Sequence, residues 1–212
     1  MSMPVCTYLE DARTCYEEVS ETCYKLRRAF SRKSVLCPCG DGPGTAFHRY
    51  FRVSFGWLCL QELVCVDYVP EGSGVSWLYR SAAGALSMRE TKLPCHGSIF
   101  DSWCQGFFDA CDVVATMPPD SIFAECLTEI VDRGKDFLLF GHISHKEDPI
   151  AKWLGSEGRL KILPSLDKRG KILLPENGDL PEKDWWRDET GQLRAALPEL
   201  VWYTSLDVPG RR

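Results

Sequence analysis

Short apolar segments typical of strands alternate along the chain with segments of helical periodicity. The strand-like segments are residues 34–37, 62–66, 75–79, 112–116, 137–140, 160–163 and 200–204, and the helical segments are residues 8–31, 46–55, 121–133 and 150–155. This alternation predicts an α/β fold with a mostly parallel sheet. Residues 81–93 and the Gly- and Pro-rich residues 164–198 show neither pattern, so we expect them to be largely loop.

The length of 212 residues suits one sizeable domain with its own core. We expect residues 1–33 to form an N-terminal helix that packs on a domain formed by residues 34–212. No apolar run is long enough to cross a membrane, and residues 1–10 lack the basic and apolar regions of a secretory signal. These features predict a cytoplasmic protein without membrane association.

The net charge of the chain is −5, with 25 basic and 30 acidic residues. A basic field over the whole protein, which would attract nucleic acid, is therefore absent. Any binding of nucleic acid would have to use a local patch of the surface.

Eleven cysteines all lie before residue 127. A zinc site favours two Cys-x-x-Cys-like pairs, or one such pair with a His-x-x-x-His pair. The closest match is Cys37-Pro38-Cys39, which has no second pair at a suitable spacing. Several other cysteines lie within apolar segments, where a free thiol behaves as a small hydrophobic group. We therefore predict buried structural thiols and no metal site.

Ligands of open α/β sheets bind at the carboxyl ends of the strands, where the strand order reverses. The segments that follow predicted strands are residues 37–45, 67–69 and 116–121. The first of these is rich in glycine and leads into a helix, a turn that lets a cofactor approach the backbone. It has neither the G-x-G-x-x-G spacing nor the Gly-Lys-Ser/Thr of a phosphate-binding loop.

The segment Asp112-Val-Val-Ala-Thr-Met-Pro-Pro-Asp-Ser-Ile-Phe123 is a strand that ends in two prolines. Amino-methyltransferases place Asn/Asp/Ser-Pro-Pro-aromatic at such a strand end. The first side-chain oxygen and a proline carbonyl accept hydrogen bonds from the target amine, and the aromatic ring stacks on a flipped base.

Together these segments resemble the EcoRI-type adenine-specific DNA methyltransferases. The family has a Cys-Pro-Cys turn, followed at fixed spacing by Ser, by Phe and by a Tyr-Phe pair. A Gly-Asp-Phe motif and a strand that ends in Thr-Asn-Pro-Pro-Phe-Ser-x-Phe come next. A strand that ends in Gly-Asn and a Trp-Phe-Thr-Asn-Leu-Asp segment complete the pattern. The matching residues are Cys37-Pro38-Cys39, Thr45, Phe47, Tyr50-Phe51, 97–100, 116–123, 137–142 and 202–207. The match is collinear over residues 35–212.

The resemblance implies a Rossmann-like fold of the S-adenosylmethionine-dependent methyltransferase type for residues 34–212, and DNA as a partner. It implies contacts with S-adenosylmethionine at Cys37, Pro38, Cys39, Gly40, Asp41, Asp67, Gly97, Ser98 and Thr116. It places the catalytic motif at Met117, Pro118, Pro119 and Asp120.

The departures from the family pattern fall on positions to which the resemblance assigns a functional role. The replacements are Gly40 for an acidic residue, Ser98 for an aspartate, Met117 for the asparagine that polarises the amine, Asp120 for the stacking aromatic residue, and His142 and Ser205 for two further asparagines. A thioether is only a weak acceptor of hydrogen bonds. The family pattern also continues past residue 212, so we expect part of its DNA-recognition region to be absent.

Three functions are compatible with this degenerate motif. The first is an active or weakly active adenine methyltransferase. The second is a non-catalytic methyltransferase-like protein, a pseudoenzyme that acts by binding DNA or a protein partner. The third is a methyltransferase with a different substrate, on which Asp120 serves as the acceptor.

Overall fold

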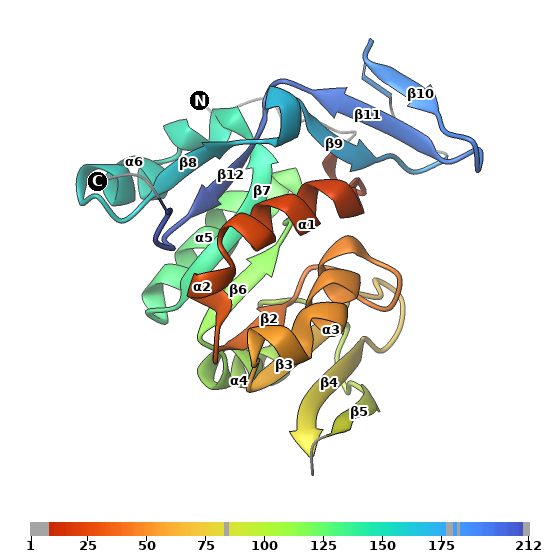
Figure 1. Ribbon diagram of the computed structural model, residues 1–212, viewed down its shortest axis with the longest axis vertical. Helices are drawn as coiled ribbons and strands as arrows, with labels where there is room; N and C mark the ends of the chain where they lie inside the picture. The colour runs from red at the N-terminus through yellow and green to blue at the C-terminus, as the bar shows by residue number, and fades with distance from the viewer. Residues whose placement is uncertain (1–8, 83–84, 177–179, 182, 210–212) are drawn as a thin grey trace.

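The structure is a computed structural model that describes residues 9–82, 85–176, 180–181 and 183–209. Its central sheet, visible in Figure 1, contains eight strands among these residues. In spatial order the strands are β5 (Ala85–Lys92), β4 (Val75–Ala82), β3 (Glu62–Asp67), β2 (Ser34–Cys37), β6 (Val113–Thr116), β7 (Asp136–His142), β12 (Leu200–Thr204) and β8 (Lys161–Pro164). The α/β class predicted from the sequence is confirmed.

The prediction of a mostly parallel sheet needs correction, because the sheet is mixed. Only the four central strands, β3, β2, β6 and β7, run parallel to one another. The β3–β4 and β4–β5 pairs on one side and the β7–β12 and β12–β8 pairs on the other are antiparallel. The parallel part therefore consists of the three strands whose ends carry the predicted ligand loops, β2, β3 and β6, together with β7.

Helices cover both faces of the sheet, so the domain has three layers. They are α1 (Tyr16–Lys25), α2 (Arg27–Phe30), α3 (Ala46–Leu58), α4 (Ser102–Ala110), α5 (Phe123–Asp132) and α6 (Pro149–Ser156). Alternate strand residues point to opposite faces. Val35 and Cys37 pack with α1, α2 and α3, whereas Leu36 packs with α4, α5 and α6. The two hydrophobic clusters therefore meet across a sheet that is buried on both sides.

The segment 164–198, predicted to be largely loop, contains three strands of a second sheet. This small antiparallel sheet has the order β1 (Arg13–Thr14), β9 (Gly170–Leu173), β11 (Leu193–Leu197) and β10 (Trp185–Arg187). Figure 1 shows it extending from one edge of the main sheet. The strands were missed because turns rich in Gly and Pro interrupt them and several of their side chains are polar.

Three other expectations also differ from the structure. Residues 81–93, expected to be loop, include β5, whose side chains are almost all exposed and so lack an apolar face. Helix α4 was not predicted, because Gly106 interrupts its pattern. The helix predicted for residues 8–31 is shorter and broken into α1 and α2 after the strand β1. Residues 1–8, where that prediction begins, lie outside the described residues.

The strand order reverses between β2 and β6. From β2 the chain passes through α3 to β3 on one side, and after β4, β5 and α4 it returns to β6 on the other side. Val35 and Leu36 pair with Val113 and Val114. The loops after β2 and β6 thus leave neighbouring strands at the reversal point, where the fold class places ligands. Among the described residues, no helix is long and apolar enough to span a membrane.

Candidate functional site

The glycine-rich turn after β2 is held by contacts from three other parts of the chain. The guanidinium of Arg13 donates a hydrogen bond to the carbonyl of Gly40. The backbone of Asp41 donates to the carbonyl of Val66 in β3 over 3.0 Å. A Cβ atom on Gly42 would lie 2.9 Å from the ring of Trp77, so a larger residue would force a shift at this contact.

Asp41 links the ends of three parallel strands. Its carboxylate accepts a hydrogen bond of 2.6 Å from the hydroxyl of Thr116 at the end of β6. Burial raises the pKa of Asp41 to about 7, against the opposing effects of the Thr116 hydrogen bond and the positive charge of Arg13. The carboxyl group of Asp41 therefore changes its protonation state near neutral pH, at the point where β2, β3 and β6 meet.

A cleft of about 460 Å³ opens beside the turn. Its lining residues are Arg13, Thr14, Gly42, Pro43, Gly44, Thr45, Ala46, Asp67, Trp77 and Leu173. The volume is within the range of about 300–1,000 Å³ typical of small-molecule sites. One cationic, one anionic and one aromatic side chain line it, a set that can bind a ligand with both charged and aromatic parts.

A second cavity, next to Met117, is small. Its volume is only about 20 Å³, and residues 12–14, residues 39–41, residues 45–47 and Met117 line it. A cavity of this size accommodates about one water molecule. The N-terminal residues 12–14 therefore occupy the space between the β2 turn and the β6 loop.

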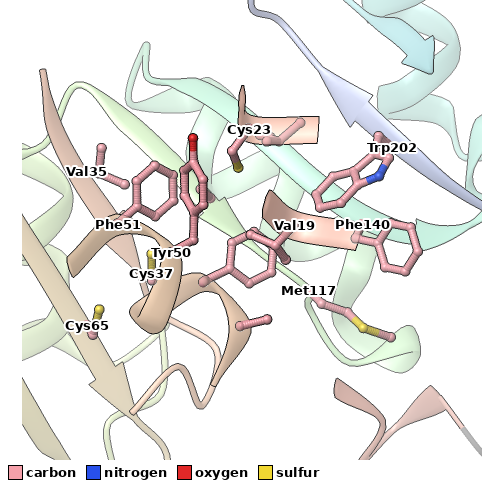
Figure 2. Close-up of a cluster of buried hydrophobic side chains, with 14 of the residues drawn as sticks. Val19, Cys23, Val35, Cys37, Tyr50, Phe51, Cys65, Met117, Phe140 and Trp202 are labelled. Carbon is pink, nitrogen blue, oxygen red and sulfur yellow. The ribbon is translucent and has the colours of Figure 1, made fainter. Parts of the chain in front are cut away.

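Met117, at the first position of the degenerate motif, points into the protein core. Its side chain is 8% exposed and belongs to the same buried cluster as Phe140 and Trp202, as Figure 2 shows. The hydroxyl of Thr14 donates to the Met117 sulfur over 3.3 Å. The thioether, already a weak acceptor, thus has a partner within the protein.

Asp120 is part of a largely buried chain of three titratable groups. Its carboxylate lies 2.8 Å from Nε2 of His145, and Nδ1 of His145 lies 3.0 Å from the carboxylate of Asp148. The side chain of Asp120 is only 6% exposed. Burial lowers the pKa of His145, but the hydrogen bonds and charges of Asp120 and Asp148 outweigh this effect and raise it above its ordinary value.

The ring of Phe123 stacks on the imidazole of His145. Their centroids are 4.2 Å apart and their planes differ by 8°. Phe123 begins α5, and His145 lies in the 3₁₀ helix η3 (Ile143–Glu147) after β7. The loops after β6 and β7 are thus joined by ring stacking as well as by the contact of Asp120 with His145.

Glu10 fixes the N-terminal segment to the β6 loop from outside. Its carboxylate accepts hydrogen bonds from the backbone of Ser121, over 2.8 Å, and from the hydroxyl of the same residue, over 2.7 Å. Together with Arg13 at Gly40 and Thr14 at Met117, this contact brings residues 10–14 across both loops of the reversal point.

Comparison with known protein families assigns the chain. The family described as adenine-specific methyltransferase EcoRI matches residues 10–212. The chain belongs to this EcoRI-type family. The resemblance read from the collinear motifs is therefore confirmed.

Curated relatives in the family include type II methyltransferases from three bacteria. M.MpnI of Mycoplasma pneumoniae is 27% identical over 203 residues, which cover 91% of this chain and 60% of M.MpnI. M.EcoRI of Escherichia coli is 26% identical over 220 residues, and M.MgeORF184P of Mycoplasma genitalium is 23% identical over 204 residues. The chain spans about 60% of the length of these relatives. Among solved structures, YeaZ from Pseudomonas aeruginosa matches with a TM-score of only 0.23 at 11% identity. The matched region covers 65% of this chain and 68% of the YeaZ chain.

The cofactor residues implied by the EcoRI-type pattern lie in three settings. Asp67 lines the open cleft, whereas Cys39, Gly40 and Asp41 line the small cavity. Cys37, Pro38, Gly97 and Thr116 are buried in the scaffold, and Ser98 is half-buried beside Asp101. The structure thus brings the β2 turn and Asp67 together, while Gly97 packs behind Asp67, against its backbone carbonyl.

The four residues that match the catalytic motif of the EcoRI-type pattern also differ in their surroundings. Met117 and Pro118 are buried, Pro119 is half-buried, and Asp120 contacts His145. Four side chains at the site were not predicted from the sequence: Arg13, Thr14, Trp77 and His145. No spacing in the sequence indicates that residues 13, 14 and 77 lie beside residues 37–45, because the contacts depend on the tertiary fold.

Proposed function

We propose that this chain has a Rossmann-like methyltransferase fold that retains a site for S-adenosylmethionine and has lost the site that activates an adenine amine. It would then act by binding, as a non-catalytic or very weakly catalytic member of its family. The strand reversal between β2 and β6, with ligand loops on both strands, supports this fold type. The observation that carries the loss of catalysis is that Met117 and Asp120 both have partners within the protein.

The family uses S-adenosylmethionine, and the residues around the cleft suit its parts. The carboxylate of Asp67 can accept hydrogen bonds from ribose hydroxyls, and the indole of Trp77 offers an apolar aromatic surface for the purine. The guanidinium of Arg13 can pair with the carboxylate of the amino-acid part. When bound, the cofactor would supply an activated methyl group on its sulfonium.

The exocyclic amine of adenine is a poor nucleophile, because its lone pair is delocalised into the ring. An acceptor that engages the amine hydrogens in the transition state is therefore required for fast transfer. Losing one such hydrogen bond costs about 2.7–4 kcal/mol, which corresponds to a rate loss of roughly a hundred- to a thousandfold. The Met117 sulfur is a weak acceptor and already receives the Thr14 hydroxyl, so it cannot replace the missing amide oxygen.

The family relation suggests DNA as a partner, and a protein partner is the alternative for a member that acts by binding. With a net charge of −5, DNA would be bound through a local surface rather than by the overall field. An altered substrate that uses Asp120 would require this carboxylate to leave His145, and we disfavour it for that reason.

The proposal is tested by calorimetric titration with S-adenosylmethionine and by methyl transfer from labelled cofactor to DNA of mixed sequence. The wild-type chain should bind the cofactor and transfer no methyl groups above background. The double variant Met117→Asn with Asp120→Phe restores the family residues, and its thermal unfolding provides the control for folding. Transfer to adenine at an ordinary rate by the wild type would show that catalysis is intact, and an absence of cofactor binding would refute the retained site.

A further inference from the structure

Three potential metal ligands meet in a part of the molecule that the proposed function does not use. The sulfur atoms of Cys95 and Cys104 and a carboxylate oxygen of Asp101 all lie within 4.8 Å of one another. Cys95 lies in the loop between β5 and α4, Asp101 immediately precedes α4, and Cys104 is in the first turn of that helix. Among the residues that the structure describes, no other group of three or more Cys, His, Asp or Glu side chains meets at this distance.

The backbone around Cys95 is tightly held. Gly74 donates a hydrogen bond of 2.7 Å to the carbonyl of Cys95, and Val69 donates one of 2.9 Å to the carbonyl of His96. A Cβ atom on Gly97 would lie 2.3 Å from the carbonyl oxygen of Asp67, and φ of Gly97 is +85°. Only glycine fits this close approach. The loop is therefore fixed before any ligand binds, which favours a preorganised site.

The carboxylate of Asp101 is turned away from its usual role. Asp101 is the N-cap residue of α4, a position where aspartate ordinarily accepts a hydrogen bond from the first turn of its helix. Here the side chain makes no such bond. It accepts instead from the backbone of Ser98 over 3.1 Å and lies beside the two thiols. Hydrogen bonds of this kind orient carboxylates that bind metals.

We propose that Cys95, Asp101 and Cys104 bind one zinc ion, with water at the fourth position. Two sulfur ligands favour zinc over magnesium, calcium or manganese, and a tetrahedral site with three protein ligands keeps one position open. Cys104 is buried, whereas Cys95 and Asp101 are half-buried, so the ion can enter from solvent. The three ligands have a Cys-x5-Asp-x2-Cys spacing, which differs from the Cys-x-x-Cys-like pairs that are typical of zinc sites.

Zinc at this place would tie the loop to the start of α4. The same loop carries Gly97, which packs against Asp67, and Asp67 lines the open cleft. The metal would therefore stabilise the support of the cleft from behind without contacting its ligand. This role is structural and does not depend on whether the chain binds S-adenosylmethionine.

The test is a competition titration of the purified chain with Zn²⁺ against a chromophoric chelator, in the presence of a reductant that is not a thiol. We expect one equivalent to bind. Replacing either thiol, in Cys95→Ser or Cys104→Ser, should weaken zinc binding by about 100-fold or more, and Asp101→Asn by about tenfold or more. A control at the C-cap of α4 is Cys111→Ser, because Cys111 is also buried but lies outside the cluster. Its affinity should match the wild type.

Thermal unfolding separates loss of the site from loss of the fold. Zinc should raise the Tm of the wild type and of Cys111→Ser, since a ligand bound only to the folded state stabilises it. It should leave the Tm of a Cys95→Ser, Cys104→Ser double variant unchanged, and Asp101→Asn offers a folded variant if that double change unfolds the chain. Absence of stoichiometric binding by the wild type, or an unchanged affinity in Cys95→Ser and Cys104→Ser, would overturn the proposal.

Discussion

The loop after β2 and the loop after β6 leave neighbouring parallel strands but differ in what their polar groups face. Beside the β2 turn, Arg13 and Asp67 line an open cleft of about 460 Å³. Beside the β6 loop, the cavity is about 20 Å³. There the side chains of Met117 and Asp120 contact Thr14 and His145.

Under the proposed function, this difference separates a lost catalytic loop from a retained cofactor cleft. Pro118, Phe123 and the strand β6 are buried in the core. Met117 and Asp120 have partners inside the protein, and the contact of Asp120 with His145 satisfies buried polar groups. On the β2 side, by contrast, the charged side chains of Arg13 and Asp67 line an open cleft. We therefore expect changes in the β6 loop to act on stability and changes around the cleft to act on ligand binding.

The largest effect should follow from Asp120→Ala. The change removes one partner of His145 and leaves only Asp148, so the free energy of unfolding should fall by roughly 2–3 kcal/mol, the contribution of a charged hydrogen bond. For a chain of this length, Tm should fall by about 4–12 °C. Asp207→Asn, a change at a fully exposed carboxylate, is the matched control and should be neutral.

The pH dependence sharpens the same prediction. The pKa of His145 is raised in the folded state, so the stabilisation from its charged form is complete below the unfolded value of about 6.5 and is lost as the pH rises through the folded value. The difference in Tm between the wild type and Asp120→Ala should thus be larger at pH 5.5 than at pH 8.5. A difference that grows with pH would contradict the charged network.

A smaller effect of opposite sign is expected for Asp41→Asn. Burial raises the pKa of Asp41 to about 7. Between about pH 4 and that value the folded state binds more protons than the unfolded state, so the wild type loses stability as the pH rises. The neutral amide can still accept from Thr116 and avoids burying a charge. Asp41→Asn should therefore be more stable than the wild type at pH 8, by on the order of 2 kcal/mol, with little gain at pH 5.

Chemical denaturation at the two pH values measures this effect. The linear dependence on urea gives the free energy of unfolding for each protein, and equal slopes would show that the unfolded states are comparable. Equal destabilisation of Asp41→Asn at both pH values would show that the carboxylate is needed as an anion and that its burial is compensated.

The smallest effect should come from the cleft. Asp67→Asn keeps the size of the side chain but removes its charge, so the Kd for S-adenosylmethionine should rise about tenfold, as expected for one charge-assisted hydrogen bond. Stability should change little, because Asp67 is only half-buried. Calorimetric titration measures the Kd, and Asp207→Asn again serves as the control. An unchanged Kd would contradict the assignment of the cofactor to this cleft.

The sequence predicted the centre of the fold better than its edges, for a physical reason. Strands β2, β3, β6 and β7 are apolar because both of their faces are covered, and this produces a clear pattern. The edge strand β5 has exposed side chains, and β10 has Trp185 and Trp186 exposed. Such strands owe their conformation to pairing with a neighbour, so their own residues give little indication of it.

The site was predictable only where a motif lies on a strand end. The motifs at Cys37 and Met117 pointed to adjacent strands, and the pairing of β2 with β6 places them there. The partners Thr14 and His145 were not predictable, because each reaches the β6 loop from a distant part of the sequence. The cysteine spacing likewise gave no indication of the cluster at Cys95, because a loop and a helix start bring its members together.

The contacts of the N-terminal segment have a consequence for how the chain reaches its native state. Ser121 binds Glu10 across 111 positions, Met117 binds Thr14 across 103, and Trp202 donates to Glu18 across 184. Contacts so distant in sequence form slowly, because closing the intervening loop costs entropy before any contact is gained. Residues 10–18, which are synthesised before β6 and β12, must therefore wait for these strands to be made. We expect them to remain unattached through most of synthesis and to join the domain as a late step of folding.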